Sequence, residues 1–298
     1  MDASDLAVFA AVARTGAITK AARTLNTVQS NVTQRVRLLE AELGVPLFHR
    51  HSRGVTLTGA GSQLLPYAER IGALLSEARK AAADGVVARG RISVGALETA
   101  TALRLPPVLA SYAARCPDVD MEIVTGTSAE LIDAVLARRL EVAFVAGPVR
   151  HPELEARPMV AEELVLVTAP SIAGTGDLRS LAGTGKLKLV VFRRGCTYRA
   201  HLEAMLAAEG ILDPRRLEFG TLDGILGCVA AGIGITLLPR AVAARAAEER
   251  RVRLHDLPRA RARVETVLIR RRDAFVSTAL ARFIEIAQRA LRRPRDPR

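Results

Sequence analysis

The chain has 298 residues, of which 49% are hydrophobic and 25% are charged, with a formal net charge of +12 and three cysteines. This composition is typical of a globular protein long enough for two domains, and no apolar run reaches the roughly 18 residues that a membrane-spanning helix needs. Because the N-terminus shows no signal-peptide pattern and three cysteines offer neither a disulfide framework nor a zinc site, we expect a cytoplasmic protein without metal or cofactor.

The first 43 residues predict three helices, over 5–14, 18–25 and 29–43. Gly16 ends the first helix, and the run at 26–28, which is polar and then β-branched, separates the other two. In the third helix apolar residues recur at intervals of four, three and four, which indicates one buried stripe: Val32, Val36, Leu39 and Leu43. Two helices around such a short break predict a helix-turn-helix.

The face opposite this stripe carries amide, hydroxyl and guanidinium groups, which are the groups that read base edges and phosphates in a major groove. Its members are Gln29, Ser30, Asn31, Thr33, Gln34, Arg35 and Arg37. Thr19 and Val28 complete the candidate DNA contacts in this region. From periodicity alone, an amphipathic helix whose polar face only meets solvent is an equally good interpretation.

A wing is predicted next, from two short strands at 47–50 and 55–58 that enclose a turn. Arg50 and Arg53 lie near its tip and are candidates for contacts to phosphate or to a minor groove, although arginines that only meet solvent are the alternative. Thr58 is placed to cap a following helix.

In that following helix apolar residues recur at intervals of four and three, a coiled-coil period that predicts a dimerisation seam. The seam consists of Leu64, Ala68, Ile71, Leu75 and Ala78, with Ala82 at its end. Pro66 should kink the helix or delay its start. Packing of the helix on its own domain is the alternative to a seam. A polar run at 84–91 marks a domain boundary.

From Ile92 strands alternate with helices, which favours βαβ units and a parallel sheet. The first set has strands at 92–97, 120–125 and 141–146, with helices at 103–114 and 128–138 between them. The second set has strands at 163–168, 188–192, 217–219 and 234–238, with helices at 198–209 and 223–231. A strand at 264–270 and a helix at 274–292 return to the first set. We therefore expect two α/β lobes over one cleft.

The positive charge lies mostly away from the helix pair. Residues 1–60 carry seven Lys or Arg against four acidic residues, whereas residues 245–298 carry sixteen against seven. A basic C-terminal segment more often improves solubility than reads a sequence, so the net charge is not used as evidence for DNA binding.

In this order, the helix pair, the wing, the seam helix and the two lobes resemble a LysR-type transcriptional regulator over essentially the whole chain. The resemblance is most specific at residues 9–22, 29–48 and 57–61, and it is moderately specific at 227–240. The run Val28-Gln29-Ser30-Asn31-Val32-Thr33 stands where members often have Ser-Gln-Pro-Ala-Leu-Ser, which implies a different operator, and Gly59 stands where Glu is usual.

The resemblance implies an α/β protein in three parts. These are a winged helix-turn-helix at 1–60, a linker and dimerisation helix with a hinge at 61–90, and a regulatory domain like a periplasmic binding protein at 91–298. Lobe I of that domain should span about 91–162 and 267–298, and lobe II about 163–266. The implied partners are double-stranded operator DNA, further copies of the chain in a dimer or tetramer, a small-molecule effector between the lobes and, for an activator, RNA polymerase.

The cleft can also be argued from the residues, because ligands in parallel α/β sheets bind beyond the carboxyl ends of strands, near helix N-termini. Four such ends carry small or hydroxylic residues, although each hydroxyl taken alone is better explained as a helix cap. The candidate effector contacts are Glu98, Thr99, Thr127, Ser128, Gly147, Gly195, Cys196, Thr197 and Thr221. A small organic acid is the default effector, but Glu98 would oppose it unless Arg199 or Arg104 pairs with Glu98. A zwitterion or an amine therefore stays open.

Two rival functions involve Cys196. Arg193, Arg194 and a helix N-terminus should lower the pKa of its thiol, which would suit a redox switch, while a pocket-lining thiol is the simpler interpretation. Paired with His201 it would form a nucleophile and a base, but the sequence contains no HExxH, GxSxG or phosphate-loop motif, so we expect no enzyme. Cys228 is predicted to pack in a core and Cys116 to lie in an exposed turn.

A ligand-binding protein made only of the two lobes is the third class. Such a protein would not need the helix-turn-helix and wing predicted at residues 1–60, so a DNA-binding regulator explains the sequence better.

Overall fold

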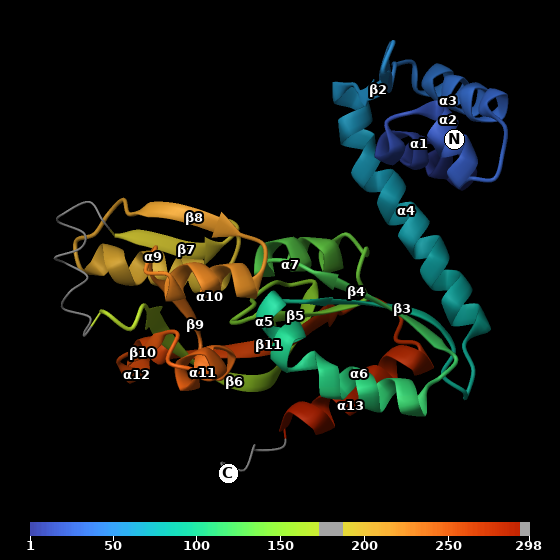
Figure 1. Cartoon of the computed structure of the whole chain (residues 1–298). Helices are drawn as coiled ribbons and strands as arrows, with labels where there is room; N and C mark the ends of the chain where they lie inside the picture. The colour runs from blue at the N-terminus through green and yellow to red at the C-terminus, as the bar shows by residue number, and fades with distance from the viewer. Residues whose placement is uncertain (173–186, 293–298) are drawn as a thin grey trace. The chain divides into compact units, whose positions relative to one another are not determined.

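The computed structural model describes residues 1–172 and 187–292 (Figure 1). The chain forms two compact units, residues 1–84 with 137–139, and residues 85–136 with 140 onward. The end of the predicted regulatory domain, beyond residue 292, lies outside the described residues. Within the described parts, no helix combines the length and the apolar character needed to cross a lipid bilayer.

The N-terminal unit contains the predicted helices and wing. Its elements are α1 (Ala3–Thr15), α2 (Ile18–Thr24), α3 (Gln29–Leu43), β1 (Phe48–His51), β2 (Gly54–Leu57) and α4 (Gly59–Ala83). Asp2 and Asp5 form a capping box that starts α1. Asn26 has a φ of 50°, so the break predicted between α2 and α3 is a left-handed turn of the kind that Asn tolerates.

The core of this unit uses the stripe of α3 that the spacing predicts, with one exception. Val32, Val36 and Leu39 are buried, and the ring of Phe9 on α1 packs 5.3 Å from that of Phe48 on β1. Leu43 was predicted to be buried and is exposed. It is the last residue of α3, directly before the turn at Gly44, so the helical spacing no longer aims it at the core.

Helix α4 begins where Thr58 was predicted to cap it, since the Thr58 hydroxyl accepts a hydrogen bond from the Gly61 N–H at 3.0 Å. The prediction that Pro66 delays the start of this helix is wrong. The helix is continuous from Gly59 through Pro66 to Ala83, because its start is set by the cap and its first half is held by packing against α1.

The predicted seam residues of α4 divide into two groups. Ala68 is buried, and Leu64 and Ile71 are half-buried, all in the core of the N-terminal unit. Leu75 and Ala78 are exposed, and so are Tyr67 and Leu74 on the same helix. The packing of α4 on its own domain, which was the alternative interpretation, therefore accounts for the first group and leaves the second group free.

The second unit is built on a seven-stranded sheet with the order β10-β6-β11-β5-β3-β4, and β9 also pairs with β6. The strands are β3 (Gly90–Ala96), β4 (Val119–Thr125), β5 (Val142–Ala146), β6 (Leu154–Thr168), β9 (Thr236–Pro239), β10 (Arg253–Asp256) and β11 (Arg263–Arg271). The pairs β3–β4 and β3–β5 are parallel, which confirms the prediction for the first set of strands. The prediction is wrong for the described pairs that involve β6 or β11, which are antiparallel. These pairs are antiparallel because β6 and β11 carry the chain between the lobes in opposite directions.

A separate parallel pair, β7 (Lys188–Phe192) and β8 (Arg215–Phe219), belongs to lobe II. The helices are α5 (Glu98–Leu103), α6 (Leu105–Arg115), α7 (Ser128–Leu136), α9 (Thr197–Ala208), α10 (Leu222–Ala230), α11 (Arg240–Glu248), α12 (Arg259–Ala262) and α13 (Thr278–Arg292). The sequence patterns missed α11, β10, α12 and the first part of β6. Charged side chains interrupt the hydrophobic spacing of all four segments.

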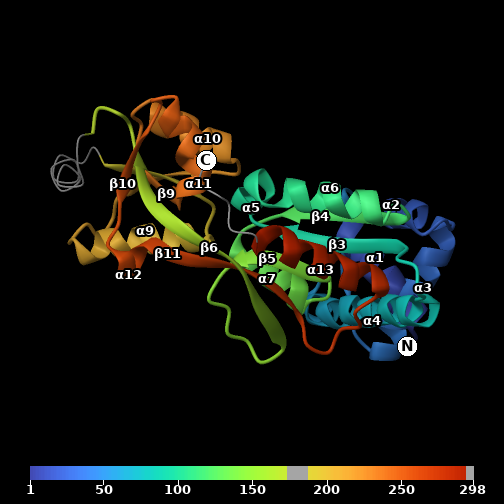
Figure 2. The same cartoon turned by 90° about the horizontal axis from the view of Figure 1, so that it is seen from below.

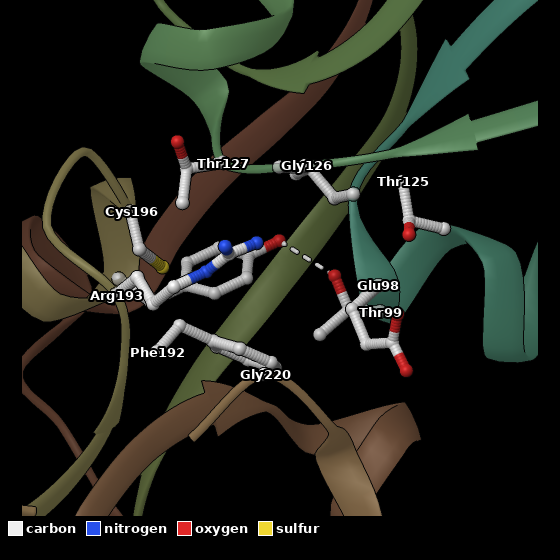
Figure 3. Close-up of a pocket in the computed structure, with 11 residues that line it drawn as sticks. Glu98, Thr99, Thr125, Gly126, Thr127, Phe192, Arg193, Cys196 and Gly220 are labelled. Atoms are coloured by element: carbon white, nitrogen blue, oxygen red, sulfur yellow. Dashed lines mark hydrogen bonds between the residues drawn. The ribbon is translucent and has the colours of Figure 1, made fainter. Parts of the chain in front are cut away.

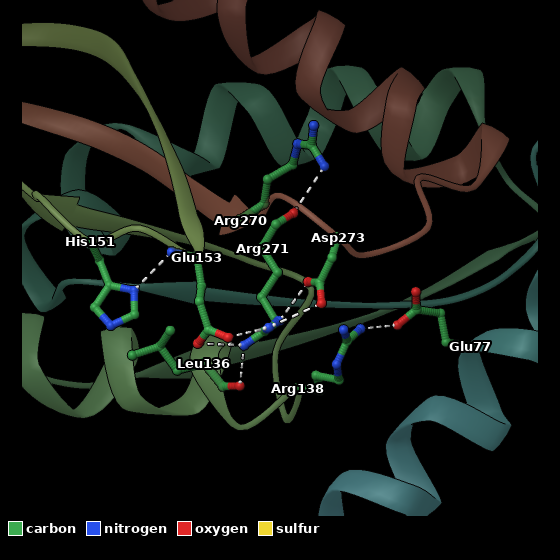
Figure 4. Close-up of polar contacts among 8 residues, drawn as sticks. All are labelled: Glu77, Leu136, Arg138, His151, Glu153, Arg270, Arg271 and Asp273. Carbon is green, nitrogen blue, oxygen red and sulfur yellow. Dashed lines mark hydrogen bonds and ion pairs between the residues drawn. The ribbon is translucent and has the colours of Figure 1, made fainter.

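The two lobes share β6 and β11, which run side by side between them (Figure 2). The second part of β6 pairs with β9 and β10 in lobe II, and β11 also pairs with β5 in lobe I. Arg271 fixes the lobe I end of β11, since its guanidinium donates to the Leu136 carbonyl at 2.9 Å and pairs with Glu153 and Asp273 (Figure 4). The strands β6 and β11 therefore connect the two lobes on either side of the cleft.

Two cysteines are placed by this fold. Cys116 was predicted to lie in an exposed turn, but it is buried at the end of α6, because it packs into the core that α6 covers. Cys228 is half-buried and packs against the core of lobe II, as the apolar character of its helix predicts.

Candidate nucleic-acid interface and inter-lobe pocket

The predicted reading face of α3 is the solvent face of the helix. Gln29, Ser30, Asn31, Gln34 and Arg37 are exposed, and Thr33 is half-buried. Most of them line a shallow groove together with Leu38 and Ala41. Thr19 on α2 and Val28 at the start of α3 are exposed as well. Six polar side chains are therefore available along one helix.

Some of these side chains are already engaged within the unit. Asn31 donates its amide N–H to the Thr27 hydroxyl at 2.9 Å, and the Thr33 hydroxyl donates to the Gln29 carbonyl at 2.9 Å. The side chains of Gln29, Gln34 and Arg37 make no hydrogen bond or ion pair with any described residue. The Ser30 hydroxyl likewise has no partner among the described residues, so four side chains of this face have all their polar groups free.

Two of the predicted DNA-contacting arginines have partners in their own unit. Arg35 pairs with Asp5 of α1 at 3.2 Å, and Arg50 of the wing pairs with Glu40 of α3 at 3.5 Å. Glu40 also accepts the backbone N–H of Leu47 at 2.8 Å, so this carboxylate joins α3 to the wing. Arg53, at the wing turn, has an exposed side chain with no partner among the described residues.

The wing is fixed to the rest of the unit at a close approach of two glycines. The Val55 N–H donates to the Gly16 carbonyl at 2.9 Å, and a Cβ on Gly54 would lie 2.3 Å from the same oxygen. Gly54 also has a φ of 140°, which side-chain-bearing residues rarely adopt. The position of the wing turn that carries Arg53 therefore depends on glycine at residue 54.

A pocket lies between the two lobes of the regulatory unit (Figure 3). It has about 410 Å³ of free space, part of which is open to solvent. Lobe I lines it with Leu97, Glu98, Thr99, Thr125, Gly126 and Thr127, and lobe II lines it with Phe192, Arg193, Cys196, Tyr198 and Gly220. This volume suits a small ligand.

Of the nine predicted effector contacts, four line this pocket: Glu98, Thr99, Thr127 and Cys196. Arg193, Phe192 and Tyr198 were not among the predicted contacts. They directly follow or lie close to the predicted strand at 188–192, so the rule that ligands bind beyond strand ends was the signal that could have found them.

Three further predicted contacts join the lobes beside the pocket instead of lining it. The Thr197 hydroxyl donates to the Ser128 hydroxyl at 3.0 Å, and the Gly195 carbonyl accepts the Ala129 N–H at 3.3 Å. Gly195 has a φ of 95°, and a Cβ there would lie 2.9 Å from the Thr127 hydroxyl oxygen. A larger residue at 195 would therefore separate the lobes.

The last two predicted contacts have other roles. The Thr221 hydroxyl accepts the Gly224 N–H at 3.3 Å and caps α10, which is the alternative considered for each hydroxyl. Gly147 donates its N–H to the Glu265 carbonyl of β11 at 2.7 Å and does not line the pocket.

The pocket also contains a hydrogen bond between the lobes. The hydroxyl groups of Thr99 and Tyr198 lie 3.4 Å apart, and both side chains are buried. Burial raises the pKa of the Tyr198 phenol, so Tyr198 stays neutral at physiological pH. It therefore contributes a neutral hydroxyl and an apolar ring to the pocket.

Neither arginine proposed as a partner of Glu98 has that role. Arg104 forms a two-pronged ion pair with Glu162, at 2.7 and 2.9 Å, and Arg199 pairs with Glu203 and Glu218. Such a pairing was the condition for an acidic effector, and the fold brings both arginines to other carboxylates instead. No ion pair among the described residues involves Glu98.

The expectation that the Cys196 thiol has a lowered pKa is also wrong. Burial raises the pKa of this thiol, and the backbone N–H groups of Arg199 and Tyr198 only partly oppose the rise. The guanidinium groups of Arg193 and Arg194 are exposed and do not offset it. His201 is exposed, and within the described residues no hydrogen bond joins it to Cys196.

Comparisons with known proteins agree with this architecture. Residues 3–62 match the family described as bacterial regulatory helix-turn-helix protein, lysR family, and residues 87–292 match the LysR substrate binding domain. The chain is 43% identical over 282 residues to the HTH-type transcriptional regulator GltR of Bacillus subtilis strain 168, with 94% of this chain and 93% of that protein covered. It is 44% identical over 285 residues to YusT of the same strain, an uncharacterized HTH-type transcriptional regulator, with 96% and 95% covered.

One solved structure of a similar chain contains DNA. Full-length CbnR in complex with its target DNA matches this chain with a TM-score of 0.65 and 28% identity, over 97% of this chain and all of that one. CbnR without DNA is described as a LysR family transcriptional regulator and gives the same TM-score at 26% identity, with 98% and 99% covered.

The family consists of DNA-binding regulators with an effector-binding domain, and it is not a family of enzymes. The two family matches together cover most of the chain, and the two curated relatives are similar to it from end to end. This protein therefore belongs to the LysR family of transcriptional regulators.

Proposed function

We propose that this regulator binds a partly symmetric operator as a dimer, and as a tetramer when two dimers associate, and that a small molecule in the inter-lobe pocket changes its effect on transcription. Residues 1–60 would bind DNA, residues 61–90 would join two subunits and residues 91–298 would bind the effector. As an activator it would also contact RNA polymerase. It would act in the cytoplasm, where bacterial DNA is found.

The observation that carries the DNA-binding part is the solvent face of α3. Amphipathic helices usually expose charged side chains, whereas this face exposes Gln29, Gln34 and Arg37 with their polar groups unpaired among the described residues. Amide groups of this kind form paired hydrogen bonds with adenine in the major groove. Arg53 at the wing turn supports the proposal, because a cation beside such a helix suits a phosphate.

Gln29→Ala is expected to weaken operator binding by about 1–3 kcal/mol and to relax the preference at one or two base pairs. Arg53→Gln should instead weaken binding to all sequences alike, because it removes one phosphate contact. The slope of log K for DNA binding against log salt concentration should fall in magnitude by about one. Fluorescence anisotropy with operator and random duplexes, at several salt concentrations, measures both effects.

Arg79→Gln is the control for charge, since Arg79 is exposed on the last part of α4. It should leave both the affinity and the salt slope nearly unchanged. Equal losses on operator and random DNA for Gln29→Ala would count against base reading by α3.

The function as a whole is tested by footprinting the full-length protein on the DNA upstream of its own gene. Two protected half-sites, related by twofold symmetry and separated by about one helical turn or a multiple of it, are expected. Adding a small molecule that occupies the pocket should change the protected pattern. The absence of any protected site there and on genomic DNA fragments would refute the proposal.

A thiol switch at Cys196 is the alternative, and the raised pKa of that thiol argues against it, because the thiolate is the form that peroxides oxidise. We expect peroxide treatment to leave operator binding unchanged in both the natural protein and Cys196→Ser. Gel shifts before and after peroxide measure this. A response to peroxide that Cys196→Ser abolishes would restore the redox hypothesis.

A further inference from the structure

We propose that the inter-lobe pocket binds a small zwitterion of the amino-acid type, with its ammonium group beside Glu98 and its carboxylate facing Arg193. This inference rests on the proposed function, because it names the chemical class of the effector for the same pocket.

The ammonium end of the ligand is assigned from Glu98. This residue begins α5 and lines the pocket from lobe I, where its side chain is half-buried. The nearby Arg104 is held by Glu162, so no cation among the described residues offsets the charge of Glu98. A carboxylate partly withdrawn from water is stabilised by a cationic partner, and a ligand can supply one.

The carboxylate end is assigned by excluding the helix N-termini that are already capped. Glu130 accepts the Thr127 N–H at 2.8 Å at the start of α7, and Thr221 caps α10. Helix α9 starts at Thr197 without a side-chain cap, so its first backbone N–H groups add to the positive potential at this end of the pocket. Arg193 is the one cationic side chain among the residues that line the pocket, so it is the group assigned to the ligand carboxylate.

The balance of charge disfavours a simple dianion. Arg193 lies 4.0 Å from Glu130, whose pKa is lowered chiefly by the hydrogen bond from the Thr127 backbone, so Glu130 is ionised at neutral pH. Two carboxylates, Glu98 and Glu130, thus accompany one guanidinium at the pocket. A ligand with two negative charges would face one attractive group and two repulsive groups, whereas a zwitterion matches both signs.

The two charged side chains lie on different lobes, so a ligand that contacts both can change the arrangement of the lobes. Glu98 and Arg193 come from different sides of the pocket (Figure 3), and they belong to lobe I and lobe II respectively. Leu97, Phe192 and the ring of Tyr198 line the space with apolar surface. A short molecule with opposite charges at its two ends would link the lobes through both ends. It would therefore favour the closed arrangement of the lobes, and a ligand with one charge would do so less.

The experiment measures binding of the twenty standard L-amino acids to the full-length dimeric protein by thermal shift, followed by calorimetry for the best binder. The best amino acid is then compared with its N-acetyl derivative, which lacks the ammonium group, and with the corresponding amine, which lacks the carboxylate. Each derivative should bind about 10- to 100-fold more weakly, as expected for the loss of one charged contact.

Variants assign the two ends. Glu98→Gln should weaken the amino acid about 10- to 100-fold and leave the affinity for its N-acetyl derivative nearly unchanged. Arg193→Gln should weaken the amino acid and leave the corresponding amine nearly unchanged. Glu248→Gln, which removes an exposed carboxylate on α11, is the matched control and should bind the amino acid as the natural protein does.

The inference is overturned if no amino acid binds at 10 mM, a concentration chosen to reveal affinities of about 1 mM, or if the N-acetyl derivative binds as tightly as its parent. It is also overturned if Glu98→Gln binds the amino acid unchanged. Footprinting separates this failure from failure of the proposed function. A dicarboxylic acid that alters the footprint would overturn the zwitterion and leave the regulator intact, whereas a protein that protects no DNA would refute the regulator itself.

Discussion

Leu75→Asp is expected to convert the protein to monomers and to reduce its operator affinity by about 100-fold or more. Leu75 is 41% exposed on α4, a helix that also exposes Tyr67 and Leu74, so it is available to a second subunit. A carboxylate in a coiled-coil seam would be buried without a partner, and each subunit would then bind one half-site without the benefit of linkage.

Light scattering after size exclusion gives the oligomeric state, and anisotropy with the full operator gives the affinity. Ser76→Asp is the matched control, because Ser76 is also exposed on α4 and adjoins Leu75 without belonging to the predicted seam. A Leu75→Asp protein that remains dimeric and binds normally would refute the assignment of this face.

Leu75 is a better test of the seam than Ile71. Ile71 was predicted to lie in the seam, but it is half-buried in the core that α4 shares with α1, so a charge at Ile71 would also damage the DNA-binding unit. Because Leu75 is exposed and Ile71 is part of a core, a charge at Leu75 tests dimerisation without disturbing the fold.

Glu162→Gln should destabilise the regulatory domain by about 3 kcal/mol, whereas Glu163→Gln on the same strand should cost less than about 1 kcal/mol. Glu162 and Arg104 have side chains that are only 6% and 15% exposed, so removing one charge leaves the other in a largely dry site. Glu163 pairs with Arg240 at a site where the carboxylate is 55% exposed and water can replace the partner.

Urea unfolding of the two variants, followed by circular dichroism, compares their transition midpoints directly. The two glutamates are neighbours on β6 and both pair with an arginine, but they differ in burial and in the second carboxylate, Asp256, that Arg240 keeps. Both differences predict the smaller loss for Glu163→Gln. Equal shifts in the two variants would contradict the view that burial makes the Arg104–Glu162 pair costly to break.

This ion pair also supports the pocket. Arg104 directly follows α5, the helix that carries Glu98 and Thr99, and Glu162 belongs to a strand that both lobes share. The pair therefore fixes the lobe I wall of the pocket to the connection between the lobes. Glu162→Gln should for this reason also weaken binding of any ligand that touches α5.

The features that could be predicted from the sequence are those that depend on neighbouring residues. The stripe of Val32, Val36 and Leu39, the cap at Thr58 and the turn at Asn26 all follow from helical spacing or from the local preferences of a side chain. The order of elements and the matches to family patterns were sufficient to identify the family, because each of these signals lies within a short stretch of chain.

The partners of charged side chains required the tertiary structure. Arg35 meets Asp5, Arg104 meets Glu162 and Arg271 meets Glu153, and these pairs are separated by 30, 58 and 118 residues. No spacing rule reaches across such separations, so the sequence could not decide whether Glu98 has a cationic partner. The same holds for the thiol of Cys196, whose pKa depends on how deeply the folded lobes bury it.

The residues that line the pocket divide in the same way. The approximate positions of its walls follow from the ends of strands in the sequence, because a parallel strand places its ligand site at its carboxyl end. Which of the nine candidates line the space, and which join the lobes beside it, depends on how α5, α7 and α9 are placed in the folded lobes. The tertiary structure brings Glu98 of lobe I and Arg193 of lobe II to the same pocket, and no ion pair joins the two side chains.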